Sequence, residues 1–221
     1  MMIAGAPVIT HTIRAALDCP DLSRVIVSTD DAEIAGVARE SGAEVIERPA
    51  ALALSDSPID DAYRHVLNHP GIAGPAESGV FVGMQANLPI RKRGELSNLI
   101  RTLLDTPWAT AVATARRVSQ RPEWMKRLKG DDSMEITAAA EPGTNFRNQD
   151  LPDLFLLDGA AMALRTEVVR SASGDRRVHS YLGDRVLIHV HDARYAIEID
   201  EIDDFELAQF HLAREQRDAT D

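Results

Sequence analysis

The chain has 221 residues, of which 44% are hydrophobic and 27% charged, and its formal net charge at pH 7 is −11. This length and composition suit one globular α/β domain, while the negative charge argues against a nucleic-acid partner, because phosphate backbones are bound by basic surfaces. The single cysteine, Cys19, excludes an internal disulfide, and without a run of roughly 20 apolar residues or a secretory signal we expect a cytoplasmic protein that does not enter a membrane.

The first part of the chain alternates the patterns of helices and of buried strands. Gly42 is typical of a residue that ends a helix, and Ser57 followed by Pro58 is typical of a capped helix start. Because parallel strands are joined by crossover helices, the alternation predicts parallel strands in a three-layer α/β/α sandwich with a Rossmann-like sheet. The predicted elements, in chain order, are a helix over residues 8–18, a strand over 24–29, a helix over 32–41, a strand over 43–47, a helix from 57 to about 68 and a strand over 79–84.

The second part begins with a strand-like run and then changes in texture. Residues 116–147 are polar, irregular and rich in both charges, and we interpret them as an inserted arm or a small secondary sheet that contacts another subunit. We expect a single domain over residues 1–221, with the arm at about 116–150. The other elements predicted here are a strand over 109–115, core segments over 154–159 and 161–164, strands over 186–191 and 195–199, and a helix over 203–217.

Two carboxylates, Glu198 and Asp200, stand at the end of the apolar run 195–197. On a strand, residues i and i+2 point to the same side, so these two side chains would project together. Paired oxygen ligands at a strand end can hold Mg²⁺ beside phosphates. The alternative is an acidic first turn that favours the dipole of the helix that follows.

Polar side chains also follow two of the predicted strands. Gln85 and Asn87 come directly after the strand over 79–84, at the kind of strand end where open α/β sheets bind ligands. Their amides could bind sugar hydroxyls or a nucleotide base, or could cap the helix that begins near residue 94. Arg48 could bind phosphate through its planar guanidinium, and Ser57 could contact a ligand or only cap its helix.

The histidines show one close pair, His189 and His191, which could share a strand face. Third and fourth ligands for zinc are not evident, so we expect no zinc site. The sequence contains neither the phosphate-binding motif of P-loop enzymes nor the dinucleotide-binding glycine motif.

Four stretches follow one another along the chain: VIVSTDDAEIA at 25–35 running into GAEV at 42–45 and RPAALA at 48–53, MQANLPIR at 84–91, QDLP at 149–152 with FLLDGA at 155–160, and AIEID at 196–200 with DFELA at 204–208. In this order they resemble the acylneuraminate cytidylyltransferase family, the CMP-sialic acid synthetases and their bacterial nonulosonate relatives. The resemblance covers nearly the whole chain.

This resemblance implies a reaction in which the anomeric hydroxyl of a nine-carbon keto-sugar acid attacks the α-phosphate of CTP and pyrophosphate leaves. Glu198 and Asp200 would be the catalytic pair and the Mg²⁺ ligands, at positions where the family usually has Asp twice. Family habit also implies a homodimer. Related alternatives are transfer to the eight-carbon acid Kdo or to another sugar, and a non-catalytic homologue that binds nucleotide or sugar. The substrate-binding residues implied are Arg48 and Ser57 for the nucleotide, and Gln85, Asn87, Lys126 and Arg147 for the sugar.

The start of the chain departs from the family pattern. Family members begin with a strand and a loop rich in glycine, arginine and lysine that wraps the CTP phosphates, whereas residues 1–9 here resemble the segment after that loop. The missing strand lies in the middle of the family's sheet, so its two neighbours would either pair with each other or leave ladder groups unpaired. We expect that the natural gene begins upstream; a shortened, non-catalytic homologue is the alternative.

Overall fold

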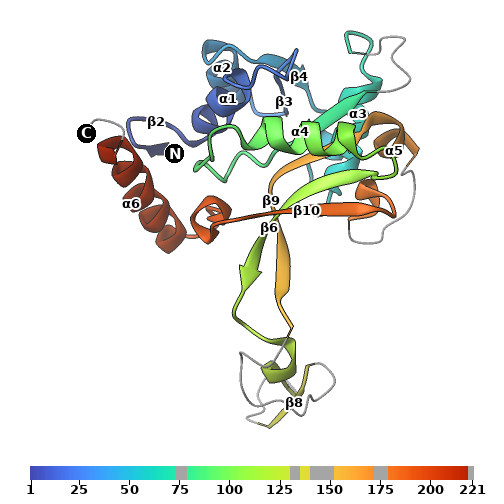
Figure 1. Ribbon diagram of the computed structural model, residues 1–221. Helices are drawn as coiled ribbons and strands as arrows, with labels where there is room; N and C mark the ends of the chain where they lie inside the picture. Colours follow the sequence, from blue (N-terminus) through green and yellow to red (C-terminus); the bar gives the residue numbers. More distant parts are fainter. Residues whose placement is uncertain (73–78, 130–134, 140–151, 172–178, 219–221) are drawn as a thin grey trace.

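The computed structural model describes residues 1–72, 79–129, 135–139, 152–171 and 179–218 (Figure 1). Its elements in chain order are β1 (Met2–Ile3), β2 (Ala6–Pro7), α1 (Val8–Leu17), β3 (Ile26–Thr29), α2 (Ala32–Glu40), β4 (Glu44–Glu47), the 3₁₀ turn η1 (Ala50–Leu52), α3 (Ile59–Asn68), β5 (Val80–Gly83), α4 (Glu95–Asp105), β6 (Ala111–Val118), η2 (Pro122–Trp124), β7 (Lys126–Leu128), β8 (Ile136–Ala138), β9 (Leu154–Arg165), α5 (Thr166–Ser171), η4 (Ser180–Leu182), β10 (Val186–His191), η5 (Ala193–Ala196) and α6 (Ile202–Asp218).

Local sequence accounts for most of these boundaries. The carboxylate of Asp31 caps α2 by accepting hydrogen bonds from the backbone N–H groups of Glu33 and Ile34, at 2.8 and 2.9 Å. Gly42 follows the end of α2 with φ of +93°, a conformation that glycine adopts without strain, so the predicted helix end is confirmed. The predicted start of α3 is wrong in one detail: Pro58 is the cap residue and no side chain caps the helix.

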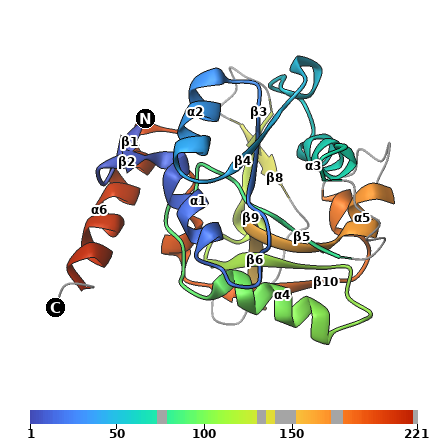
Figure 2. The same ribbon diagram turned by 90° about the horizontal axis from the view of Figure 1, so that it is seen from above.

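A four-stranded sheet with the order β10-β6-β9-β5 forms the centre of the fold (Figure 2). β10 is parallel to β6, and β9 is antiparallel to both β6 and β5, so three strands run one way and β9 runs the other. β3 and β4 form a separate parallel pair. The predicted α/β sandwich is confirmed, but its sheet is mixed because the chain returns through β9 after the arm instead of through a crossover helix.

Helices cover both faces of the sheet. α1 and α4 pack on one face against alternate residues such as Val112 and Ala163. α3, α5 and η4 pack on the other face against Ala113 and Leu164, which lie one residue further along their strands. Because successive strand residues point to opposite faces, short apolar strands can serve both cores, and the three-layer arrangement results.

β3 and β5 face each other across a gap. Among the described strands, β3 is hydrogen-bonded to β4 and β5 to β9, and no pairing joins β3 to β5. Both strands instead line one cavity of about 680 Å³. Of the two alternatives for these neighbouring strands, pairing with each other is therefore wrong, and among the described strands β3 and β5 each have one paired neighbour only.

The arm predicted from the polar segment contains a two-stranded antiparallel sheet, β7 with β8. Figure 1 shows the distal parts of β6 and β9 projecting from the body, with the β7–β8 hairpin near the far tip. Contact of this arm with another subunit stays a prediction.

The C-terminal segment differs from expectation in one place. The strand predicted over 195–199 is absent: η5 turns over Ala193–Ala196, and an irregular stretch leads to α6. α6 packs through Ala208 and Leu212 against Ile3 and Ile90, so it holds the first residues of the chain and the loop after β5 together. Within the described ranges, no helix is both long and apolar enough to cross a membrane.

Candidate active site

The cavity between β3 and β5 is the candidate site. Its wall includes the full length of both strands, together with Arg48 after β4 and Gln85 and Asn87 after β5. The predicted nucleotide residue Arg48 and the predicted sugar residues Gln85 and Asn87 are therefore brought to one cavity.

Arg48 is held against the end of β3. Its Nη2 donates to the backbone oxygen of Ser28 at 2.6 Å, and its Nε donates to the Ser28 hydroxyl at 3.2 Å. These bonds fix the plane of the guanidinium at the cavity wall. A cation held in this way can meet an anionic ligand with little loss of side-chain freedom.

Ser57 does not join this group. Its hydroxyl accepts a hydrogen bond from the backbone N–H of Leu54 at 3.1 Å and lies 3.5 Å from the carbonyl oxygen of Ala51. These contacts close a local turn, and Ser57 is not part of the cavity wall. The structure supports neither its N-cap role nor a place beside Arg48.

Glu198 and Asp200 meet at the side chain of Asn87. The Asn87 Nδ2 donates to Glu198 Oε1 at 3.2 Å and to Asp200 Oδ1 at 3.3 Å. The backbone is joined at the same point, because the Ile199 N–H donates to the Asn87 carbonyl oxygen at 2.9 Å. The two carboxylates therefore point the same way, as the i, i+2 spacing predicts, although the segment is irregular and not a strand.

This donor set fits a hard divalent cation. Glu198 and Asp200 are exposed, so their carboxylates are open to solvent and ligands. Mg²⁺ is typically held by one or two carboxylates and completes its shell with water and substrate phosphates. In the described part of the chain, no group of three or more His, Cys, Asp and Glu side chains is placed to hold a metal ion.

A buried ionic network lies behind the loop that carries Gln85. His191 Nδ1 is 2.9 Å from Glu95 Oε1, and His191 Nε2 is 2.9 Å from Asp158 Oδ2. The other oxygen of Asp158 accepts from the Thr114 hydroxyl at 2.6 Å and from the Ala160 N–H at 3.0 Å. These contacts join α4, β10, β9 and β6 beneath the candidate site.

The charges of this network follow from its contacts. Burial alone would lower the pKa of His191, but its hydrogen bonds to Asp158 and Glu95 and their negative charge raise it to about 9. Burial would raise the pKa of Asp158, but hydrogen bonds from His191, Thr114 and Ala160 hold it below its usual range. His191 is therefore an imidazolium between two carboxylates at neutral pH.

Arg91 connects the network to the Gln85 loop. Its guanidinium donates to the carbonyl oxygens of Gln85 and Ala160 and, at 3.1 Å, to the hydroxyl of Thr12. Burial lowers the pKa of Arg91 to about 10, so it remains cationic at neutral pH. Sequence reasoning did not single out Arg91, Glu95 or Asp158. The pair His189 and His191 was noticed, but only as a poor zinc site.

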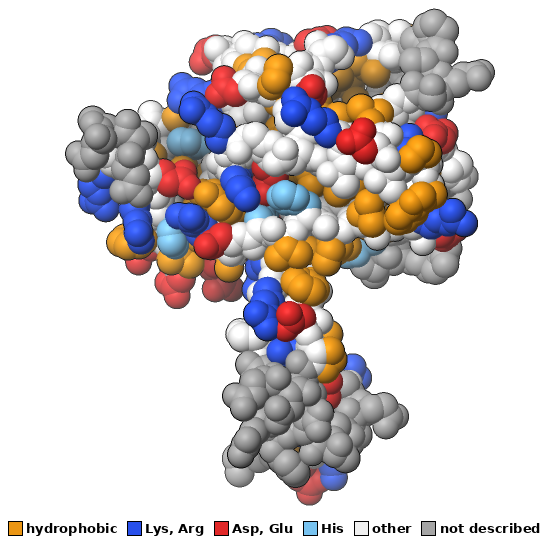
Figure 3. Space-filling view, in the orientation of Figure 1, with side chains coloured by type: hydrophobic (Ala, Val, Ile, Leu, Met, Phe, Trp, Pro, Cys, Tyr) orange, Lys and Arg blue, Asp and Glu red, His pale blue; other side chains and the backbone are white. Residues whose placement is uncertain are grey.

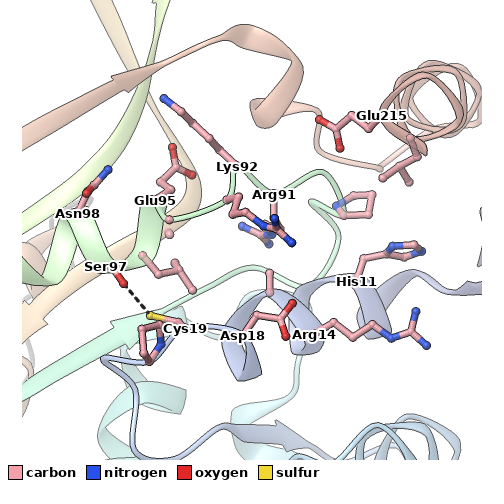
Figure 4. A pocket seen from close by; sticks show the side chains of 18 of the residues that line it. His11, Arg14, Asp18, Cys19, Arg91, Lys92, Glu95, Ser97, Asn98 and Glu215 are labelled. Carbon is pink, nitrogen blue, oxygen red and sulfur yellow. Dashed lines mark hydrogen bonds between the residues drawn. The ribbon is translucent and has the colours of Figure 1, made fainter. Parts of the chain in front are cut away.

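A second cavity of about 820 Å³ lies between α1, the start of α4 and α6, and Arg91 lies in its wall (Figure 4). Basic side chains including Arg14 and Lys92 surround it together with Asp18 and Glu215. None of the seven expected substrate and metal residues that the structure describes lines it, so it is not the candidate active site.

Of the two remaining predicted sugar residues, Lys126 is the one within the described ranges, and it does not line the cavity between β3 and β5. Lys126 is exposed on β7, in the arm that Figure 1 shows projecting from the body. Arg147 lies outside the described residues.

Comparisons with known proteins extend over the whole fold. The sequence profile of a family described as cytidylyltransferase matches residues 1–171. The N-acylneuraminate cytidylyltransferase A of Danio rerio is 26% identical over 214 residues, which cover 96% of this chain and 46% of that protein. The 3-deoxy-manno-octulosonate cytidylyltransferase of Oleidesulfovibrio alaskensis is 27% identical over 146 residues, covering 63% of this chain and 56% of that protein. The chain thus spans about half the length of the curated relatives it matches.

A solved structure gives the same fold. CMP:2-keto-3-deoxy-manno-octonic acid synthetase in complex with CTP superposes with a TM-score of 0.70 at 16% identity, covering 97% of this chain and 91% of that one. At this identity the likeness concerns the fold alone. Because the family profile spans more than three quarters of the chain and includes Arg48, Gln85 and Asn87, this protein belongs to the cytidylyltransferase family.

Proposed function

We propose that the protein transfers CMP from CTP to an acidic nine-carbon keto-sugar of the nonulosonic, sialic-acid-like class and releases pyrophosphate. One observation carries the proposal: Asn87, which lines the cavity between β3 and β5, donates from its amide to both Glu198 and Asp200. These groups come from segments more than 100 residues apart in a chain of the cytidylyltransferase family. A pair of open carboxylates at a polyanion site suits a metal-assisted nucleotidyl transfer.

The residues divide the work by their charge and position. Arg48, fixed on Ser28, binds the nucleotide, and Gln85 and Asn87 bind the polar groups of the sugar. Glu198 and Asp200 hold Mg²⁺, which when bound screens the charge of the phosphates and of the leaving pyrophosphate. The chain's own contribution is to hold two anionic substrates in line for attack on the α-phosphate.

A second candidate acceptor is the eight-carbon acid Kdo. The relatives include both N-acylneuraminate and 3-deoxy-manno-octulosonate cytidylyltransferases at similar identity, 26% and 27%. The longer coverage of this chain by the first relative, 96% against 63%, favours the nine-carbon acceptor.

The proposal is tested by incubating the protein with CTP, Mg²⁺ and one of four acids: N-acetylneuraminate, pseudaminate, legionaminate or Kdo. Pyrophosphate and the CMP-sugar are then measured. Product with one of the first three acids supports the proposal, and product with Kdo alone supports the alternative acceptor. If no acid gives product and a CMP-sugar still raises the unfolding temperature, the protein is a binding homologue without catalysis.

We also propose that the working unit is a homodimer in which the arm of one copy completes the site of the other. Lys126, the candidate for the sugar carboxylate, lies on the projecting arm, away from its own Gln85. Figure 3 shows hydrophobic side chains exposed where the arm leaves the body, and Phe155, Leu156, Ile188 and Val190 are 41–49% exposed. An apolar face of this kind is typical of an interface between copies.

This arrangement predicts complementation between two inactive variants. A mixed dimer of Lys126→Ala and Asp200→Ala chains has one site with an intact body and an intact arm. Co-expression should therefore restore about one quarter of wild-type activity, given random pairing in a two-fold dimer. Each variant alone serves as the control, and no recovery in dimers shown by mass to be mixed would place Lys126 outside the partner's site.

A further inference from the structure

β9 carries a large bulge beside the candidate site. Between the pairs Ala113–Met162 and Ala115–Leu157, β6 contributes one residue and β9 contributes the four residues 158–161. The single residue of β6 is Thr114, whose hydroxyl bonds to Asp158 and accepts the N–H of Ala161 at 3.1 Å. β-Bulges often redirect the chain next to functional sites. Hydrogen bonds to Thr114 hold this bulge at both of its ends, Asp158 and Ala161.

Gly159 lies at the tip of the bulge with φ of +71°. A Cβ at this position would lie 2.7 Å from Cδ, 2.7 Å from Nε2 and 2.8 Å from Oε1 of Gln85. These three nearly equal distances mean that the Gln85 amide lies with its flat face against the Gly159 backbone. Any side chain at residue 159 would therefore force the amide away.

The position of the amide is also fixed from the other side. Arg91 donates to the backbone oxygen of Gln85 and to that of Ala160, so the loop after β5 and the bulge are tied to one guanidinium. Asp158, the residue before Gly159, is held by His191 and Thr114. These hydrogen bonds therefore hold the bulge, and with it the backbone beside the Gln85 amide, in one position.

The side chain of Gln85 is held in place, but its capacity to form hydrogen bonds is not fully used. Its Oε1 is buried and has no hydrogen-bond partner among the described residues. A buried acceptor without a partner is unfavourable, and a ligand hydroxyl or N–H in the cavity could satisfy it.

We infer that Gly159 is a positioning residue, which sets the plane of the Gln85 amide so that its oxygen accepts a hydrogen bond from a hydroxyl or N–H group of the acidic sugar. This inference rests on the proposed function and assigns the sugar side of the reaction to the β9 bulge. CTP binding, which involves Arg48 on the far strand pair, should be nearly independent of it.

The test is Gly159→Ala, with KM and kcat measured separately for the sugar and for CTP. The loss of one well-placed hydrogen bond predicts an increase of about 10- to 100-fold in the sugar KM. The CTP KM should change less than about twofold, because the segment after β4 that carries Arg48 is not disturbed. Gly5→Ala is the matched control for backbone strain, because Gly5 has φ of +81° and an added Cβ would meet no atom within 4 Å.

A double variant separates contact with Gln85 from general damage. If the methyl group acts only through the amide, Gly159→Ala adds little to the effect of Gln85→Ala, so the two changes are strongly non-additive. Additive effects, an unchanged sugar KM, or an equal rise in both KM values would overturn the inference while leaving the proposed function intact.

Crystal structures provide a readout that does not depend on activity. The Gln85 amide should move away from residue 159 in Gly159→Ala and keep its place in Gly5→Ala. If the wild type acts on no sugar, the proposed function fails, and this displacement still decides whether Gly159 sets the amide. An undisturbed amide in Gly159→Ala would contradict the inference.

Discussion

Asp200→Ala is expected to lower Mg²⁺-dependent pyrophosphate release by about 1,000-fold or more, because removal of one ligand leaves the phosphate charge poorly screened. Asp200 is exposed and its only described side-chain contact is the Asn87 amide, so the fold should persist. Turnover with CTP and the accepted sugar would be measured over a range of Mg²⁺ concentrations, and circular dichroism would check the fold.

Asp203→Ala is the matched control. It removes the same acid three residues along, from the exposed first turn of α6. The loss of a favourable charge at a helix start costs about 0.3–1 kcal/mol of stability and should leave turnover within about twofold. Wild-type turnover in Asp200→Ala, or an equal loss in both variants, would refute the assignment of Asp200 as a metal ligand.

His191→Gln is expected to remove a pH-dependent part of the stability. The pKa of His191 is raised from 6.5 to about 9, so the folded state holds this proton more tightly than the unfolded chain does. The stabilisation is therefore complete below pH 6.5 and is lost as pH rises through about 9. The shift corresponds to about 3 kcal/mol, which is large against a typical total of about 5–15 kcal/mol.

The groups that face His191 come from every element around it. Glu95 approaches from α4 and Asp158 from β9, His189 lies on the same strand, and the ring of Tyr195 is 5.8 Å away between centroids. Replacing His191 by glutamine also leaves the carboxylates of Glu95 and Asp158 without the imidazolium between them. This adds a loss of stability that does not follow the pH window of His191. The informative quantity is therefore how the difference in unfolding free energy between wild type and His191→Gln changes with pH.

Urea unfolding of wild type and His191→Gln would be compared at intervals from pH 6 to pH 10. The difference in unfolding free energy should shrink by about 3 kcal/mol over this range. His211→Gln, in α6 and outside the network, controls for the His-to-Gln change itself. A difference that stays constant with pH would mean that His191 is not held as an imidazolium.

The sequence predicts the layers of this fold better than its strand pairing. The helices from α1 to α3 and strands β3 to β5 follow from local apolar spacing, which is a short-range property. The reversal of β9 depends on where the chain returns after the arm, and the absent strand over 195–199 reflects the packing of α6 against Ile3 and Ile90. Such long-range contacts leave little trace in local periodicity.

The candidate site, too, could be predicted from the sequence only in part. The spacing of Glu198 and Asp200 predicts that they point together, and they do, although by way of an irregular segment. The network of Glu95, His191 and Asp158 joins three elements that are distant in sequence, so no spacing rule could reveal it. Ser57 shows the converse. The pair Ser57 and Pro58 predicts a side-chain cap, but Pro58 is the cap residue of α3 and no side chain caps the helix.

The central claim is that Glu198 and Asp200 share a divalent cation beside the nucleotide. The most direct test is the anomalous scattering of Mn²⁺ in crystals of the protein grown with CTP. The account predicts a Mn²⁺ peak between the two carboxylates, within about 2–2.5 Å of an oxygen of each and in contact with the CTP phosphates. Bound CTP with Mn²⁺ on other residues, or with neither carboxylate near the metal, would contradict it.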